Sequence, residues 1–144
     1  IVRTIIVYGK AHNMSRSNLI LWVLEALPKG QPMNIVNDQF RAPTWADDLA
    51  MGCWLVVEKQ QTGIFHISGP ETKSILDWVL LIGKHFGWST ENVTPISTST
   101  LNQAAKRPPK TGFDLSKSRT ILGYSPKKME ETLDVLMREM GVEK

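Results

Sequence analysis

Apolar residues recur along the chain with two different periods, and segments of the two kinds alternate. Residues 1–8 are apolar almost throughout, which is typical of a strand covered on both faces within a parallel sheet. Residues 19–27 instead repeat apolar side chains at helical spacing until Pro28 ends the pattern. Ser15 or Ser17 is expected to cap this helix. Because strands and helices alternate, the pattern favours an α/β architecture over a helical bundle.

Two capping boxes mark the starts of two further helices. Thr44 with Asp47 predicts a helix that runs to about Lys59, and Ser74 with Asp77 predicts another. In the second of these helices one face is apolar, and its members are Ile75, Trp78, Val79, Ile82 and Phe86. Both helices are therefore expected to pack one side on the core.

Three short strands and a last helix complete the expected elements. Residues 33–36, 64–67 and 93–96 have strand composition, and the last of these is expected at the edge of a sheet. Ser125 followed by Pro126 has the form of a cap with proline at the first helical position. The final helix then carries an apolar face made of Met129, Leu133, Leu136 and Met140.

Length and composition fit one ordinary domain, so residues 1–144 are expected to form a single unit. The net charge of +3 comes from 17 basic and 14 acidic side chains without a run of like charge, which gives no indication of nucleic-acid binding. No stretch approaches the roughly 18 apolar residues that span a bilayer. The beginning of the sequence also lacks the pattern of a secretory signal, so no membrane partner and a cytoplasmic location are expected.

Neither cysteine nor histidine forms a pattern that binds a metal. Cys53 is the one cysteine, and its apolar surroundings in the sequence predict a small buried side chain. His12, His66 and His85 lie too far apart to resemble the closely spaced ligands of zinc sites. No metal site is predicted.

Two common kinds of catalytic motif are absent from the sequence. It has no Gly-x-Gly-x-x-Gly turn and no P-loop, so it offers no usual cradle for a pyrophosphate. It also has no Gly-x-Ser-x-Gly elbow, which disfavours a serine hydrolase. We therefore expect no catalytic residue within these 144 residues.

Three residues are candidates for binding a ligand on the basis of their position. Tyr8 ends a predicted parallel strand, where α/β proteins bind ligands, although tyrosine at a strand end is also a common packing residue. Arg41 lies just before a helix and Arg107 lies on a proline-stiffened connector. A guanidinium so placed can bind a diphosphate or carboxylate through two hydrogen bonds, and the alternative is a solvated surface arginine.

Several runs, taken in order, resemble the C-terminal half of extended short-chain dehydrogenase/reductases that act on nucleotide sugars. Residues 2–9 are similar to the sheet strand that follows the catalytic helix of that family, and residues 37–50 resemble the segment that leads into the next helix. The Asp-Gln, Pro-Thr and Asp-Leu-Ala pieces of residues 37–50 are most similar to dTDP-4-dehydrorhamnose reductases. Further similar runs follow at residues 63–69, 74–77, 107–108 and 113–117.

The resemblance implies a Rossmann-like fold in which this chain supplies remnant parallel-sheet strands and a small mixed α/β substrate lobe. It implies that a preceding half binds NAD(P) and holds the catalytic Tyr-x-x-x-Lys pair, so this portion alone is expected to be inactive and without a cofactor of its own. Tyr8, Asn13, Arg41 and Arg107 are then expected to contact a nucleotide-sugar substrate. Tyr8 and Gly9 are also expected to border the cofactor.

The resemblance leaves the reaction open among three alternatives. The first is reduction of a 4-keto group on a nucleotide-linked deoxysugar, and the second is epimerisation or dehydration of such a sugar. The third is a non-catalytic regulatory or binding module of the same fold, with which Arg41 is compatible because rhamnose-pathway reductases often have glycine there. In each case the apolar strand at residues 1–8 is expected to join two copies in a homodimer, or to be partly disordered, unless another chain covers it.

Overall fold

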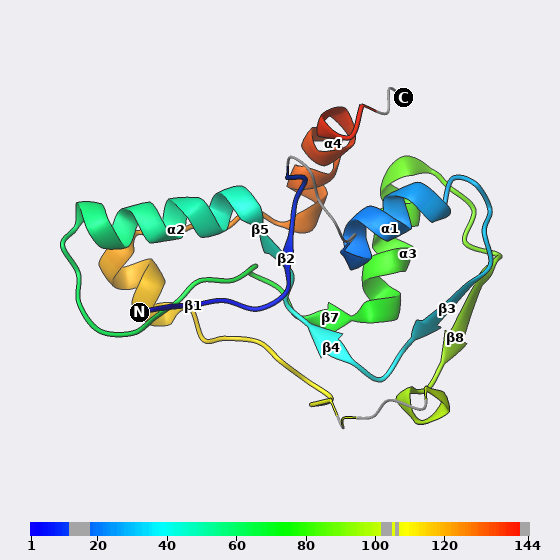
Figure 1. Ribbon diagram of the computed structural model, residues 1–144, viewed down its shortest axis with the longest axis horizontal. Helices are drawn as coiled ribbons and strands as arrows, with labels where there is room; N and C mark the ends of the chain where they lie inside the picture. The colour runs from blue at the N-terminus through cyan, green and yellow to red at the C-terminus, as the bar shows by residue number, and fades with distance from the viewer. Residues whose placement is uncertain (12–17, 102–104, 106, 142–144) are drawn as a thin grey trace.

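The computed structural model describes residues 1–11, 18–101, 105 and 107–141. Figure 1 shows an elongated arrangement of the elements. Helix α2 (Ala46–Glu58) lies at one end, and the two paired strands β3 (Met33–Val36) and β8 (Val93–Ile96) lie at the other. The remaining helices stand between these ends, so the chain passes several times through the middle of the molecule.

Within the described residues the strands form four pairs, three of them parallel and one antiparallel. The parallel pairs are β1 (Val2–Arg3) with β6 (Phe65–His66), β2 (Val7–Tyr8) with β5 (Thr44–Trp45), and β3 with β8; the antiparallel pair is β4 (Phe40–Arg41) with β7 (Lys73–Ser74). Helices connect the strands of the parallel pairs, as parallel pairing requires. The predicted α/β class is confirmed.

The expected continuous strand over residues 1–8 is wrong, because the segment is divided between two partners. The backbone oxygens of Ile5 and Ile6 both accept hydrogen bonds from Thr44, one from its hydroxyl at 2.8 Å and one from its N–H at 2.8 Å. Ile6 has φ of +32°, which breaks the extended conformation. The chain thus leaves β6 after Arg3 and pairs with β5 from Val7 onward, a change that local hydrophobicity does not encode.

Helix α1 (Leu19–Ala26) has the apolar face that its sequence predicts. Its N-cap is Asn18, whose side-chain oxygen accepts a hydrogen bond from the N–H of Leu21 at 3.0 Å. The predicted caps Ser15 and Ser17 lie outside the described residues. Asn18 is therefore the cap because its short side chain reaches the first turn.

The two predicted capping boxes have different outcomes. Helix α3 (Ile75–Phe86) begins with the box of Ser74 and Asp77, as predicted. The box expected at Thr44 is wrong, because α2 has Trp45 as its N-cap without a side-chain hydrogen bond. The Thr44 hydroxyl instead donates to the oxygen of Ile5, so tertiary pairing has taken the group that a local cap would use.

The final helix, α4 (Met129–Glu139), starts later than Ser125-Pro126 predicts. The carboxylate of Asp48 accepts a hydrogen bond from the N–H of Lys127 at 2.8 Å, and this contact holds the preceding segment against α2. Glu131 then accepts from the N–H of Lys128 at 2.7 Å and satisfies the first turn. The π-helical turn η2 (Ser118–Leu122) and the 3-10 turn η1 (Thr98–Thr100) are the other short elements.

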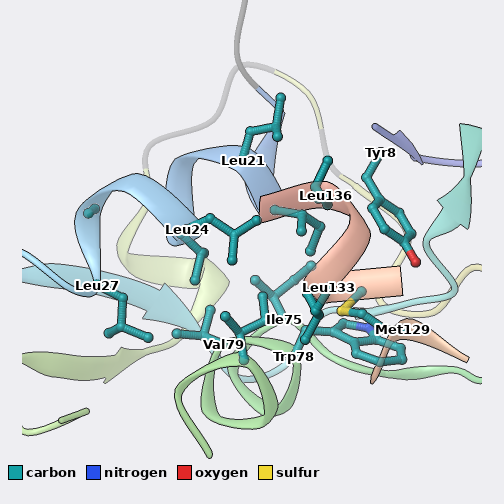
Figure 2. Close-up of a cluster of buried hydrophobic side chains, with 14 of the residues drawn as sticks. Tyr8, Leu21, Leu24, Leu27, Ile75, Trp78, Val79, Met129, Leu133 and Leu136 are labelled. Carbon is teal, nitrogen blue, oxygen red and sulfur yellow. The ribbon is translucent and has the colours of Figure 1, made fainter. Parts of the chain in front are cut away.

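The larger of two apolar clusters lies among α1, α3, α4 and β3. Figure 2 shows side chains of the three helices pointing toward one another, with Leu24, Val79 and Leu133 near the centre and Tyr8 at one side. The smaller cluster lies beneath α2 and contains Phe65, Ile67, Leu115, Leu122 and Tyr124. Burial of these side chains is the main favourable contribution to folding.

Helix α2 differs from its expected packing. Cys53, predicted to be buried, is exposed, and Trp54 and Val57 are also exposed. The packed side of α2 contains Gly52, where an added Cβ would lie 2.6 Å from Ile67. The apolar residues of α2 occupy more than one face, so their spacing alone does not identify the inner one. Among the described residues, no helix is long and apolar enough to cross a membrane.

Candidate anion site

Arg41 is a buried cation whose hydrogen-bond partners are all neutral. It lies in β4 and is 6% exposed. Its Nη2 donates to the side-chain oxygen of Gln39 at 2.8 Å, and its Nη1 donates to the backbone oxygens of Phe40 at 2.7 Å and Pro109 at 3.2 Å. A buried charge without an opposite charge is costly unless a ligand balances it.

The segment that contains Arg107 runs beside β4. The N–H of Phe40 donates to the oxygen of Pro109 at 2.7 Å, and the N–H of Thr111 donates to the oxygen of Phe40 at 3.0 Å. Burial first, and then the positive charge of Arg107, lower the pKa of Arg41 below its ordinary value. The structure thus brings together the two arginines that the sequence singled out, although they lie 66 positions apart.

Neither arginine has a carboxylate partner among the described residues. The ion pairs there join Lys73 to Glu71 at 2.8 Å and His85 to Asp134 at 3.3 Å. We refer to Arg41 and Arg107 together as the anion site. Its unbalanced positive charge suits a ligand with several negative oxygens, such as a diphosphate, which guanidinium groups bind through paired hydrogen bonds.

A second layer of contacts holds the backbone of β4 in place. The indole N–H of Trp78 donates to the backbone oxygen of Arg41 at 3.0 Å. Lys73, which is opposite Arg41 in the β4–β7 pair, lies over the Trp78 ring with its Nζ 4.7 Å from the ring centre. The strand that carries Arg41 is therefore fixed by α3 as well as by β7, and such support keeps a binding residue in one orientation.

Gln39 and Asp38 are part of this region, and the sequence analysis gave them no role. The amide nitrogen of Gln39 donates to the hydroxyl of Thr98 at 3.0 Å. The carboxylate of Asp38 accepts from the Ser97 hydroxyl at 2.8 Å and from both the N–H and the hydroxyl of Thr98. These bonds, first of all the one from the Thr98 hydroxyl, lower the pKa of Asp38. The only signal in the sequence is the Asp-Gln pair of the family resemblance.

Tyr8 lies in the core and is 2% exposed. Its hydroxyl is 2.8 Å from the Oγ1 of Thr132 in α4, and its ring meets the Trp45 ring edge to face at a centroid distance of 5.5 Å. Burial, the largest effect, raises the pKa of Tyr8 above its ordinary value. Tyr8 is therefore a packing residue, which was one of the two alternatives that the sequence left open. Contact of Tyr8 with a ligand stays a prediction.

Gly9 turns the chain beside the start of α2. Its φ is +152°, and an added Cβ would lie 2.8 Å from the Cβ of Ala46, so glycine is required for the close approach. Its carbonyl accepts from the side-chain amide of Asn18 at 3.4 Å. Asn13 lies outside the described residues. Within the described part of the chain, no hydrogen bond joins Tyr8 or Gly9 to the anion site.

This combination of parallel strand pairs and covering helices is the fold of Rossmann-like extended short-chain dehydrogenase/reductases. The chain belongs to the family of the RmlD substrate binding domain, whose model matches residues 1–142. The resemblance stated from the sequence runs is thereby confirmed. Among curated protein sequences, none matches the chain.

Three solved structures illustrate the similarity. A dTDP-4-dehydrorhamnose reductase from Clostridium acetobutylicum has a TM-score of 0.81 and 25% identity over 97% of this chain and 48% of that chain. The same enzyme from Bacillus anthracis, in complex with NADP, has a TM-score of 0.79 and 26% identity over 96% and 47%. UDP-glucuronic acid 4-epimerase from Bacillus cereus, with UDP-glucuronic acid and NAD, has a TM-score of 0.72 at 23% identity over 97% and 44%, which supports the fold alone. The chain thus spans about half the length of these proteins.

Proposed function

We propose that the chain is the substrate-binding part of an NAD(P)-dependent nucleotide-sugar reductase that reduces the 4-keto group of a dTDP-linked deoxysugar. The observation that carries the proposal is Arg41, a buried cation that has no carboxylate partner among the residues that the structure describes and lies beside Arg107. The family of the chain and its similarity to two dTDP-4-dehydrorhamnose reductases support this substrate class.

In this proposal the anion site binds the diphosphate of the substrate. Arg41 lies on a fixed strand and Arg107 is exposed, so one cation is held in position while the other is open to solvent. A diphosphate placed there would orient the sugar, because its two phosphates fix both the position and the direction of the nucleotide.

The cofactor belongs to the rest of the parent protein. NAD(P) would supply the hydride, but Tyr8 is buried against α4 and Gly9 abuts Ala46, so the described residues do not by themselves fit a dinucleotide. We therefore derive no step through the cofactor in this chain. Contact of Tyr8 and Gly9 with it stays a prediction, and the 144-residue chain alone is proposed to be inactive.

A binding measurement tests the proposal. The chain is titrated with dTDP by calorimetry at low salt, beside the variants Arg41→Met and Arg119→Met; the second removes one positive charge from an exposed position on η2 and controls for the change in net charge. Losing a charged hydrogen-bond donor costs about 1.5–3 kcal/mol, so Arg41→Met is expected to weaken binding by about 10- to 100-fold. Arg119→Met is expected to bind like the original chain. Absence of dTDP binding, or equal binding by Arg41→Met, would refute the proposal.

Oxidation of NADPH separates the alternatives. With a dTDP-linked 4-keto sugar, the parent protein is expected to oxidise NADPH and the 144-residue chain is expected not to. A parent that binds dTDP without oxidising NADPH would favour the non-catalytic module, and epimerised or dehydrated product would favour an epimerase or dehydratase. NADPH oxidation by the chain alone would contradict its proposed inactivity.

A further inference from the structure

Gln39 connects the buried guanidinium of Arg41 to the turn η1. The side chain of Gln39 is itself buried, and each end of its amide has one partner: Arg41 at the oxygen and Thr98 at the nitrogen. We propose that Gln39 is a positioning residue that holds Arg41 in its binding orientation while leaving the positive charge of Arg41 free for an anionic ligand. The inference rests on the proposed function, because it concerns the same anion site.

The hydrogen-bond directions determine how the Gln39 amide is oriented. Arg41 has only donors, so the amide oxygen must face its Nη2, at 2.8 Å. The amide nitrogen then faces the Thr98 hydroxyl at 3.0 Å, and that hydroxyl donates its one hydrogen to Asp38. The series thus runs from Arg41 through Gln39 and from Gln39 through Thr98 to Asp38. The amide is therefore held from both sides, and an ordered side chain loses less freedom when a ligand binds.

The carboxylate of Asp38 bonds to Ser97 and Thr98, and no hydrogen bond or ion pair joins it to Arg41 among the described residues. Asp38 accepts the hydroxyl hydrogen of Ser97 at 2.8 Å and the N–H of Thr98 at 2.9 Å. Its negative charge therefore stabilises the start of η1. The neutral amide of Gln39 stands between this carboxylate and the guanidinium. Arg41 thus receives a well-placed acceptor without receiving a negative charge, and its own charge remains available to a diphosphate.

A carboxylate in place of the Gln39 amide would neutralise the charge of Arg41 and make it less available to a diphosphate. Gln39→Glu preserves the length and shape of the side chain but places a negative charge next to Nη2 of Arg41. An ion pair between residues 39 and 41 would then compete with the ligand for the guanidinium. Gln39→Met also preserves the length, but it removes the acceptor without adding charge.

The experiment measures dTDP and inorganic pyrophosphate affinity for Gln39→Glu, Gln39→Met and the control Gln31→Glu, which adds the same charge at an exposed loop position. We expect Gln39→Glu to lose at least tenfold in affinity for both ligands, Gln39→Met to lose less, and Gln31→Glu to bind like the original chain. Circular dichroism and the thermal midpoint establish that each variant is folded.

A double variant tests whether residue 39 acts through Arg41. If it does, Gln39→Glu added to Arg41→Met causes no further loss of affinity, whereas general charge repulsion would lower affinity in both backgrounds. Should Gln39→Glu bind dTDP normally while Arg41→Met is impaired, the role of Gln39 is refuted and the proposed function stands. If the original chain does not bind dTDP, or Arg41→Met binds it normally, the proposed function itself fails. If one of the variants Gln39→Glu and Gln39→Met does not fold, the affinity of the remaining variant is compared with that of the original chain.

Discussion

The hydroxyl of Tyr8 is expected to stabilise the fold through its bond to Thr132, and this role can be separated by experiment from contact with a ligand. The Thr132 hydroxyl donates its hydrogen to the backbone oxygen of Met129 at 2.8 Å, so the Tyr8 hydroxyl must be the donor in the bond of 2.8 Å to Thr132. This bond joins the end of β2 to the first turns of α4. Those two elements lie 124 positions apart in the sequence.

The two partners of this bond should differ in what their removal costs. Tyr8→Phe removes the donor and should lower the free energy of unfolding by about 1 kcal/mol. Thr132→Val leaves the Tyr8 hydroxyl buried without an acceptor, and it also removes the bond to Met129, so we expect a loss of about 2–3 kcal/mol. In the double variant no unpaired hydroxyl remains. Its loss should therefore be smaller than the sum of the two single losses by about 1 kcal/mol.

Urea unfolding followed by tryptophan fluorescence measures these differences, because Trp45 lies against the Tyr8 ring. With a slope of about 2 kcal/mol per molar urea, Tyr8→Phe should lower the midpoint by about 0.5 M. Its dTDP affinity should equal that of the original chain. Unchanged stability together with weaker dTDP binding would show instead that the hydroxyl contacts the ligand, as the sequence resemblance implied. Strictly additive losses would show that the two hydroxyls do not interact.

Three further changes test other parts of the structure. Burial, the largest effect, raises the pKa of Asp48 above its ordinary value of about 4. The buried carboxyl therefore favours folding most below that value and loses this contribution as the pH rises through its folded pKa. Asp48→Asn should reduce the decline in unfolding free energy as the pH rises above about 4, and an unchanged pH profile would contradict this. Gly69→Ala places a Cβ 2.0 Å from the backbone oxygen of Pro43 and should cost about 1–3 kcal/mol or more in urea unfolding, whereas a neutral result would refute this packing. Homodimerisation through residues 1–8 also stays a proposal: light scattering should show dimers that Val7→Lys dissociates and Val57→Lys, on α2, does not.

Local patterns predicted the elements that local interactions stabilise. The box of Ser74 and Asp77 involves residues three positions apart, and it forms as the sequence indicates. The apolar faces of α1, α3 and α4 were also predicted, because each helix buries one side in the same cluster. Predictions failed where a residue distant in the sequence bonds to a group that the local pattern assigned to a helix cap. Thr44 bonds to Ile5 rather than capping α2, and Asp48 fixes Lys127 and delays the start of α4.

The same distinction holds for the candidate site. Arg41 and Arg107 could be identified from residue type and position in the chain, but only the folded segment at Pro109 brings them together. Residue type and position did not identify Gln39, because its proposed role depends on Thr98, which lies 59 positions away; only the Asp-Gln pair of the family resemblance pointed to it. Burial of Tyr8 and exposure of Cys53 likewise depend on how the elements pack, which spacing alone does not determine.

The most direct test of the anion site is a titration of the isotope-labelled 144-residue chain with dTDP, followed by amide chemical shifts. The proposal predicts that the largest shift changes occur at residues 39–41 and at the non-proline positions of 107–111, which lie side by side through the bonds between Phe40 and Pro109 and between Thr111 and Phe40. The C-terminal part of α4 should change little, and the changes at β4 should disappear in Arg41→Met. Shift changes concentrated on other elements, or none at saturating dTDP, would contradict the account.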